Sequence, residues 1–305
     1  MKEKCKIAVS LVFHNEARHL PRLAEALKSQ LVLPFGIYIT DNNSSDNTVA
    51  MAEELFPGAD MVVSDENPGF GTAHNKNMKR AFNDGAEAVF ILNTDTQPDE
   101  ECLSGLNDFM QKHPATGIIS PLILYGDSSG KTSVIQNFRT FAKLKKGRIQ
   151  NIDEGKDFNE TSLPDFETVN YFSGTACLIT KSTYEKIGGF TEDNFLYGEE
   201  MDYSYRAALA GIKITAVKAA KVRHFHDWSK KNIDGLCREY YYINLNRIRY
   251  FKKYGLKKGL YSFIANEVFA APLRIRWTLK KGGRKFTGCF YSGIINGLKN
   301  KRNFK

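Results

Sequence analysis

The chain has 305 residues, of which 42% are hydrophobic and 25% are charged. This is the composition of a globular protein, and it excludes disordered, collagen-like and highly repetitive chains. The 43 Lys and Arg outnumber the 34 Asp and Glu, and the length suits one large catalytic domain with or without an appendage.

The cysteines and the N-terminus indicate the compartment. The five cysteines are an odd number, widely scattered and without a C-x-x-C pair. They match neither a disulfide framework nor a zinc cage, so we expect a reducing environment. The start, MKEKCKIAVSLVF, is too polar for a signal peptide, and no run of about 18 uncharged apolar residues predicts a transmembrane helix. We therefore expect a cytoplasmic protein.

The positive charge is concentrated at the C-terminus. Residues 252–305 hold 14 Lys and Arg but a single acid, Glu267, whereas residues 1–251 hold 29 Lys and Arg against 33 Asp and Glu. This asymmetry predicts an anionic partner for the tail, such as a membrane surface, a lipid phosphate or a nucleic acid.

Strand and helix signals alternate along the first 125 residues. Apolar runs predict strands, and a 3.6-residue period of apolar side chains predicts helices. The alternation predicts right-handed βαβ units and a largely parallel sheet, so the fold class is α/β. The expected strands are 6–13, 35–40, 60–64, 86–92 and 117–124, and the expected helices are 16–29, 45–56 (capped by Ser45 or Asp46), 72–82 and 100–112.

The second half of the chain breaks this rhythm. Residues 126–168 are rich in Gly, Ser, Lys and Asp and indicate a hairpin followed by a loop that can act as a flap. Strands are expected at 169–180 and 212–217, and helices at 200–210 and 234–254. The remaining tail contains two helical stretches separated by KKGGRK.

Three polar groups follow expected strands, namely FHNE at 13–16, DNN at 41–43 and NTD at 93–95. Ligands bind beyond the carboxyl ends of parallel strands, so these groups can hold a nucleotide with Mg²⁺ or Mn²⁺. The chain has no G-x-G-x-x-G after the first strand and no G-x-x-x-x-G-K-[ST], which argues against dinucleotide oxidoreductases and P-loop enzymes. Taken singly, each group also fits a polar turn that caps a helix.

Five motifs follow one another in order: SLVFHNE, TDNNSSDNT, NPGFGTAHNKNMKRA, ILNTDTQP and FLYGEEMDYSYRAALAG. This set, over about residues 6–250, resembles the family 2 glycosyltransferases with the GT-A fold, above all their bacterial branch with rhamnosyl- and galactofuranosyltransferases of cell-surface polysaccharides. The resemblance implies a GT-A catalytic domain at 1–251, with a Rossmann-like nucleotide-sugar half at about 1–125 and a mixed acceptor half at about 126–251. Residues 252–305 are then a basic amphipathic helical tail.

The resemblance implies a nucleotide-sugar site. Asp41 matches the family aspartate that reads the base, and Phe13 and Asn15 match the wall of the base and ribose site. Asn75 matches an Asn near the sugar diphosphate, while Asn77 stands where the family has a glycine, which leaves the start of that helix open. The same expected site also contains Glu16, Asn43, Gly69, Gly71, Asn93 and Thr94, the two glycines permitting close backbone approach.

Asn93-Thr94-Asp95 stands in for the family's Asp-x-Asp metal motif. The resemblance implies that Asp95 binds a divalent cation, Mn²⁺ or Mg²⁺, as the one direct carboxylate. His224 and His226 lie two apart after a strand and face the same way; the family often has a histidine here that contacts the metal or diphosphate, although residues alone also fit core or surface positions. Trp228 is expected on the acceptor side.

GEEMDYSYR resembles the family's acidic catalytic motif. Glu199, Asp202 and Arg206 are three and four apart, so they share a helix face and can pair. Glu200 points elsewhere, near the helix N-terminus, where the dipole favours an ionised carboxylate. Alignment makes Glu200 the general base. Glu199 stays a rival, because Glu in place of the usual Asp adds a methylene.

The tail combines an apolar face at 260–271 with the basic residues that follow it. This combination suits a helix in an anionic membrane interface, and the alternative is packing on the catalytic domain or on a second subunit. We expect a peripheral protein on the inner face of the plasma membrane, with an oligomer as an option. No nucleic-acid partner is expected, because no recognition motif accompanies the charge.

These features together predict an inverting, metal-dependent glycosyltransferase. Its donor would be dTDP-rhamnose or a UDP-sugar, and its acceptor a hydroxyl of a cell-surface glycan or lipid-linked sugar. Asn93 and the Glu-Glu pair leave room for a catalytically silent GT-A module that binds glycans or scaffolds a complex. A sugar nucleotidyltransferase is disfavoured, because SLVFHNEARHL lacks a Gly-rich basic signature.

Overall fold

The computed structural model describes residues 2–127, 132–225 and 232–300. Its centre is a ten-stranded sheet, and a two-stranded hairpin stands beside it. The strands are β1 (Ile7–Phe13), β2 (Ile37–Asp41), β3 (Asp60–Val63), β4 (Ala88–Leu92), β5 (Thr96–Pro98), β6 (Thr116–Tyr125), β7 (Ile135–Asn137), β8 (Thr140–Lys143), β9 (Arg148–Asn151), β10 (Phe166–Val169), β11 (Ala176–Thr180) and β12 (Lys213–His224).

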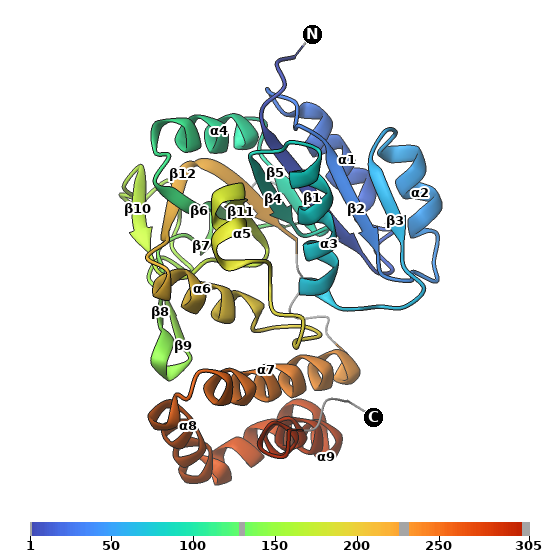
Figure 1. The fold of residues 1–305 in the computed structure, drawn as a ribbon. Coiled ribbons are helices and arrows are strands. Elements are labelled where there is room, and N and C mark those ends of the chain that lie inside the picture. Colours follow the sequence, from blue (N-terminus) through green and yellow to red (C-terminus); the bar gives the residue numbers. More distant parts are fainter. Residues whose placement is uncertain (1, 128–131, 226–231, 301–305) are drawn as a thin grey trace.

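The sheet is mixed, in the order β10-β12-β6-β11-β4-β1-β2-β3, with β5 beside β12 and β7 beside β6 (Figure 1). Strands β3, β2, β1 and β4 are parallel neighbours, which confirms the α/β class and the Rossmann-like first half. Strand β6 runs in the same direction as β4, because β11 lies between them and is antiparallel to both, and this insertion makes the second half of the sheet mixed, as predicted. Strand alternation in the sequence does not reveal that a later strand enters the middle of the sheet.

Helices cover both faces of the sheet. Buried side chains of α1, α2 and α4 join one face in a single core, and those of α3 and α6, with α5 packed against them, join the other. Helix α1 begins at Leu20, not at residue 16, with Pro21 in its first turn, where its missing N–H costs no helical hydrogen bond. The helices are α1 (Leu20–Ser29), α2 (Thr48–Leu55), α3 (Phe70–Asn83), α4 (Cys102–Lys112), α5 (Lys181–Ile187) and α6 (Glu199–Leu209), besides a 3-10 turn, η1 (Leu144–Lys146).

The irregular middle of the chain contributes more strands than predicted. The expected hairpin is β8–β9, and β7 and β10 add to the main sheet. The single strand expected at 169–180 is two strands, β10 and β11, with a loop between them. Strand β12 continues past the expected end at residue 217 to His224, through an irregularity between Val217 and Lys221. This extension places His224 opposite Thr96 of β5.

Three helices, α7 (Ile233–Lys253), α8 (Lys257–Phe269) and α9 (Ala271–Leu298), form a layer beneath the sheet (Figure 1). They share a third apolar core, which also takes in Met201 of α6. Helix α9 is interrupted at Gly282 and Gly283, the latter with a left-handed φ of 65°, as KKGGRK predicts. The predicted boundary at residue 252 falls within α7, whereas packing groups α7 with α8 and α9.

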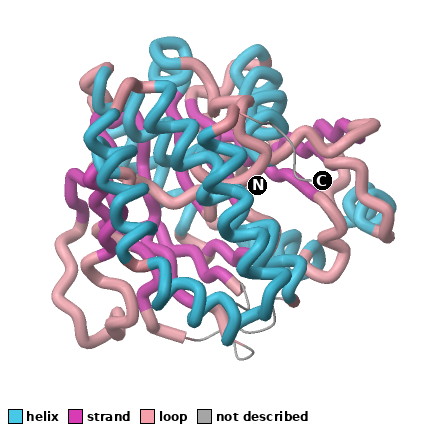
Figure 2. Tube along the Cα trace, turned by 90° about the horizontal axis from the view of Figure 1, so that it is seen from below, coloured by secondary structure: helices cyan, strands magenta, loops and turns pink. Residues whose placement is uncertain are grey.

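Figure 2 shows the molecule from below, with helices in front of the strands. None of the helices in the described part of the chain is long and apolar enough to cross a membrane.

Candidate active site

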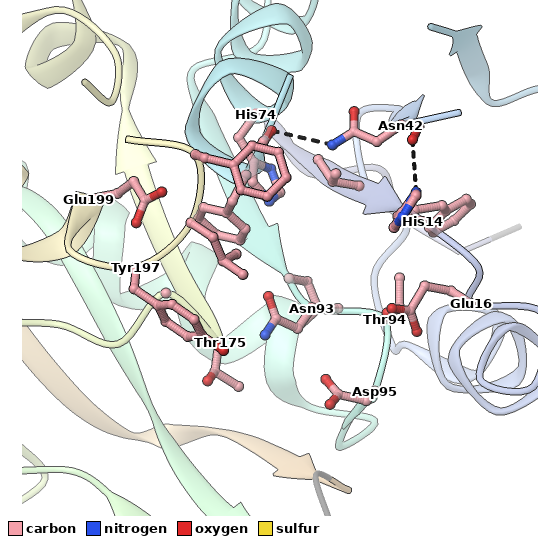
Figure 3. Close-up of a pocket in the computed structure, with 18 of the residues that line it drawn as sticks. His14, Glu16, Asn42, His74, Asn93, Thr94, Asp95, Thr175, Tyr197 and Glu199 are labelled. Carbon is pink, nitrogen blue, oxygen red and sulfur yellow. Dashed lines mark hydrogen bonds between the residues drawn. The ribbon is translucent and has the colours of Figure 1, made fainter. Parts of the chain in front are cut away.

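A cavity of about 630 Å³ opens beyond the carboxyl ends of β1, β2 and β4 (Figure 3). The sheet forms its floor, the loop before α6 forms one wall, and the first turns of α7 form another. Nine of the predicted site residues line it: Phe13, Glu16, Gly69, Asn93, Thr94, Asp95, Glu199, Glu200 and His224. His226 and Trp228 lie outside the described residues.

The end of β2 presents an amide to the cavity instead of the expected carboxylate. Asp41 is fully buried, and its two carboxylate oxygens accept hydrogen bonds from Ser44 Oγ at 2.5 Å and Ser44 N at 2.8 Å. The next residue, Asn42, lines the cavity and donates through Nδ2 to Gly69 O at 3.3 Å. Its Oδ1 is buried and has no hydrogen-bond partner among the described residues. At the end of β2 the residue that reaches the cavity is therefore Asn42 and not Asp41.

Two other predicted nucleotide residues shape the rim from outside the cavity. Asn15 and Asn43 are exposed, and both adopt a left-handed φ of 60°. Asn15 Oδ1 accepts from Ser45 N at 2.8 Å, so it joins the loop after β1 to the loop after β2. Asn and Asp tolerate this backbone region better than other non-glycine residues. The structure thus gives Asn15 a role in holding the rim.

The NPGFG segment brings the start of α3 against the loop before α6. Gly69 has a φ of 92°, and a Cβ there would collide with Phe195 O. Gly71 packs against Phe190 and the Cγ of Glu199, outside the cavity lining. Asn75 is also outside the lining, because its amide bonds the backbone of Phe190 in both directions, at 2.7 and 2.9 Å. At these glycines, the start of α3 lies close to residues 190–195, in the segment before α6.

Asn77 explains why α3 begins cleanly despite the missing glycine. Its fully buried amide donates to Ser10 Oγ, Leu11 O and Tyr38 O at 2.8–3.0 Å, and accepts from Thr40 Oγ1 at 2.6 Å. Such a fully satisfied buried amide ties α3 to β1 and β2. Helix α3 accordingly starts at Phe70, two residues before the expected position.

Asp95 and His224 meet at the floor of the cavity. Asp95 Oδ1 lies 3.2 Å from His224 Nε2, and His224 Nδ1 lies 2.9 Å from Gln136 Oε1. Because an amide oxygen only accepts, Nδ1 is the nitrogen that holds the hydrogen of the neutral ring. Nε2 lies against the Asp95 carboxylate, as an N–H donor in the protonated ring or as a lone pair in the neutral one. In the neutral form both groups are ligand types that a divalent cation takes, and a second-shell carbonyl on the other ring nitrogen is usual for metal-binding histidines.

The chemistry of Asp95 and His224 therefore fits a divalent cation. Within residues 2–127, 132–225 and 232–300, however, no group of three or more His, Cys, Asp or Glu gathers in a way that could hold a metal ion. Any cation here would need oxygen ligands from a bound substrate in addition to these two side chains.

Glu16 stands across from this pair, beside Thr94 (Figure 3). Burial, together with the nearby charge of Asp95, raises the pKa of Glu16 to about 7, although a hydrogen bond with Thr94 opposes the rise. His74, another lining residue, is neutral, because burial lowers its pKa to about 3. The cavity thus contains groups whose protonation depends strongly on burial.

Glu199 and Glu200 start α6 on the opposite wall. Glu199 is only 1% exposed, and its Oε1 has no hydrogen-bond partner among the described residues. Burial and the neighbouring carboxylate of Glu200 raise the pKa of Glu199. Burial also raises the pKa of Glu200, with the backbone N–H groups of Gly174 and Gly198 acting in the opposite sense. Desolvation thus outweighs these backbone N–H groups in setting the pKa of Glu200.

Asp202 lies outside the cavity and has a different function from its two neighbours. It pairs with Arg206 Nε at 2.8 Å, as the spacing predicts. It also accepts from Lys253 Nζ and from Tyr254 Oη, both at 2.7 Å. These contacts join α6 to the end of α7, so Asp202 has a structural part in this arrangement.

Several residues that line the cavity were not predicted from the sequence. Arg238 and Glu239 come from α7, which had no motif to mark it, and Gln136 comes from the irregular segment. Tyr197 was present in the FLYGEE motif; its φ of 68° is strained for a non-glycine residue, and Asn246 of α7 holds its carbonyl at 2.8 Å. Arg238 is the only Lys or Arg among the described lining residues, beside five acids: Glu16, Asp95, Glu199, Glu200 and Glu239.

An open α/β sheet with acids and amides around a cavity at its strand ends is the arrangement in which such folds bind ligands, and it agrees with the expected GT-A class. The model of the glycosyl transferase family 2 matches residues 9–188, more than half of the chain, and the chain belongs to this family. It is a family 2 glycosyltransferase, as the five motifs predict.

Two curated relatives are bacterial rhamnosyltransferases. N-acetylglucosaminyl-diphospho-decaprenol L-rhamnosyltransferase from Mycobacterium tuberculosis is 26% identical over 72% of this chain and 75% of that protein. O-antigen chain rhamnosyltransferase RfbN from Salmonella typhimurium is 21% identical over 74% of this chain and 68% of that protein. The chain is thus a distant homologue of rhamnosyltransferases of surface polysaccharide synthesis.

A solved structure confirms the fold. GalNAc-T7, crystallised with UDP, GalNAc and Mn²⁺, superposes with a TM-score of 0.61 and 14% identity over 81% of this chain. The chain spans about half of that protein, 48% of its length. At this identity the likeness extends to the fold alone.

Proposed function

We propose that the chain is an inverting glycosyltransferase that moves a sugar from a nucleoside diphosphate to a hydroxyl of a lipid-linked or growing surface glycan. The observation that supports this most directly is the cavity itself, which sets Asp95 and His224 on its floor and Glu199 and Glu200 on one wall. A donor diphosphate near the first pair would present its sugar toward the second. The two rhamnosyltransferase relatives favour dTDP-rhamnose as the donor, with a UDP-sugar as the rival.

The nucleotide would lie over the ends of β1 and β2. Phe13 is fully buried beneath this part of the cavity, and Asn42 at the end of β2 would lie beside the base. The buried Asp41 would act through Ser44 by fixing the turn. Arg238 would neutralise diphosphate oxygens, because it is the one basic side chain that α7 brings to the described wall.

Asp95 and His224 would hold Mn²⁺ or Mg²⁺ with phosphate oxygens as the remaining ligands. A bound divalent cation stabilises the charge that develops on the leaving diphosphate. Asn93, which replaces an acid at the start of this segment, would leave Asp95 as the direct carboxylate.

Glu200 would accept the proton of the acceptor hydroxyl. The hydroxyl oxygen then forms a bond to the anomeric carbon while the bond from that carbon to the diphosphate oxygen breaks, which inverts the configuration. Partial exposure of Glu200 gives an acceptor access to it, whereas Glu199 is almost entirely enclosed. The carboxylate of Glu200 is held by backbone N–H groups, so its orientation is set before the substrate binds.

Thermal unfolding with UDP, dTDP, GDP and CMP, each with and without Mn²⁺, tests this function. A ligand at about 100 times its Kd stabilises the folded state by roughly 2.7 kcal/mol. We expect a Mn²⁺-dependent shift with UDP or dTDP, and loss of the Mn²⁺ effect in Asp95→Asn. Asp108→Asn, an exposed acid on α4, is the matched control. No shift with any nucleotide would contradict the proposal and favour a silent glycan-binding module.

A further inference from the structure

Four of the most exposed large apolar side chains in the described part of the chain belong to α8 and to the first turn of α9. The five large hydrophobic residues with the greatest exposure in the described part of the chain are Phe269 at 88%, Leu273 at 74%, Tyr261 and Leu209 at 68%, and Val268 at 66%. All but Leu209 belong to α8 or the first turn of α9. Tyr261 precedes Val268 and Phe269 by seven and eight residues, so the three share one face of α8.

Exposed cations follow Leu273 on the same face of α9. Arg276 and Lys280 follow Leu273 at three and seven residues, so they share its helix face, and both are exposed. The only acid of the tail, Glu267, is buried and bonded to Arg274 at 3.1 and 3.2 Å. The tail therefore has no other carboxylate to neutralise Arg276 and Lys280.

We propose that this α8–α9 surface, formed by Tyr261, Val268, Phe269, Leu273, Arg276 and Lys280, docks on a lipid bilayer that contains anionic lipid. Exposed apolar groups beside cations on a helix match the boundary between acyl chains and anionic headgroups. The inference deepens the proposed function by naming the partner surface on which a lipid-linked acceptor would be reached.

The combination of cations and apolar side chains favours a bilayer over a second copy of the chain or a nucleic acid as the partner of this surface. A second copy of the chain would bring the same cations to the same surface, and like charges would repel. A nucleic acid would satisfy Arg276 and Lys280 but would leave Phe269 and Leu273 in water. An anionic bilayer satisfies both kinds of side chain, with the helices lying along its surface.

The buried faces of α8 and α9 determine how the exposed surface must be tested, namely by point substitutions. Phe263 of α8 and Phe290 of α9 are buried in the apolar core that they share with α7, and Phe286 of α9 is fully buried. Deletion of the tail would expose this core and alter α7, which lines the cavity. Substitutions confined to exposed positions leave the core intact.

The experiment uses the full chain with vesicles of phosphatidylcholine alone or mixed with phosphatidylglycerol, in a co-sedimentation assay without donor or acceptor. We expect binding to the mixed vesicles, weakened by salt. Phe269→Ser/Leu273→Ser should weaken the partition at least about tenfold. Arg276→Gln/Lys280→Gln should weaken it about thirtyfold, given two cations near an anionic surface.

Matched controls distinguish binding through this surface from non-specific apolar or electrostatic binding to vesicles. Leu209→Ser removes an apolar side chain that is 68% exposed from α6, and Lys28→Gln/Lys112→Gln removes two exposed cations from α1 and α4. Both should bind vesicles as the wild type does.

Equal loss in these controls, undiminished binding by the α8–α9 variants, or no preference for anionic vesicles would overturn the proposal. A wild-type dimer that the Phe269→Ser/Leu273→Ser variant converts to a monomer, without vesicle binding by either, would assign the surface to a second copy. The nucleotide shift measured on the same variants should match the wild type, so failure here leaves the transferase proposal standing.

Discussion

The sheet region and the C-terminal helices use charged residues in opposite ways. In the sheet region, the acids of the candidate site are enclosed: Glu199 is 1% exposed, and Asp95 faces His224 at 3.2 Å. In α8 and α9, cations such as Arg276 and Lys280 are exposed to solvent. An enclosed charge recognises one small ligand in one geometry, whereas exposed charges suit an extended anionic surface.

Helix α7 belongs to both regions. Its Arg238 lines the cavity, while Tyr240 contacts Trp277 and Phe286 of α9, with ring centroids 5.5 and 5.3 Å apart. The two regions are therefore joined through one helix, and substitutions on its two sides should separate nucleotide chemistry from surface binding.

The largest effect should come from Glu200 in the enclosed region. Glu200→Gln keeps the shape of the side chain but cannot accept a proton, so we expect kcat to fall about 10³-fold, a typical contribution of a general base. Calorimetric titration should show donor binding unchanged. If Glu199→Gln causes this loss while Glu200→Gln stays near wild type, the base is Glu199.

The pH dependence of kcat/KM checks the same assignment. Burial raises the pKa of Glu200 in the folded enzyme, and the base works only when ionised. The value of kcat/KM should therefore increase as the pH rises through a pKa above 4.5, the ordinary value of a Glu. The residual activity of Glu200→Gln should not show this increase of kcat/KM with pH.

Arg238 tests the helix that joins the two regions, and the expected effect is smaller. Arg238→Ala should raise the Kd of UDP or dTDP about tenfold, because charge-assisted hydrogen bonds to phosphate contribute roughly 1.5–3 kcal/mol. Uridine and thymidine, which lack phosphate, should bind as they do to the wild type.

Two further variants sharpen this result. Arg238→Lys should recover part of the affinity, and Arg276→Ala on the α8–α9 surface should leave nucleotide binding unchanged. Equal weakening of uridine and UDP would mean that Arg238 acts only on the structure of the cavity wall.

The sequence predicts the first half of the sheet and the position of the cavity well. Buried strands that alternate with helices must place their carboxyl ends together, so the polar groups after β1, β2 and β4 meet. Local contacts decide details that the pattern does not contain. Ser44 binds the carboxylate of Asp41, and the neighbouring Asn42 then faces the cavity.

Long-range packing explains the remaining differences. Spacing predicts the pairing of Asp202 with Arg206, but Lys253 and Tyr254 reach the same carboxylate from 51 and 52 residues away. Gln136 reaches His224 from a segment without periodicity, and Arg238 reaches the cavity because α7 packs beneath the sheet. No pattern of spacing within one segment encodes such contacts.

The smallest expected effect concerns the stability cost of the enclosed region. Folding raises the pKa of Glu199, so its protonated form is favoured in the folded state. Stability from this preference is complete below the pKa of the unfolded chain and is lost as the pH rises through the folded-state pKa. Glu199→Gln removes the titration, and its Tm should exceed that of the wild type by a few degrees at about pH 8, with little difference at about pH 5.

Glu53→Gln, an exposed acid on α2, is the control and should leave the Tm unchanged at both pH values. Differential scanning calorimetry without nucleotide measures the effect, because a bound anion or cation would alter the charge of the cavity. A pH-independent Tm difference would mean that Glu199 is ionised and stabilised in its pocket. In that case the surroundings of Glu199 would stabilise its charge as water stabilises the exposed charges of α9. The two regions would then differ in the shape of their surfaces but not in how well they solvate a charge.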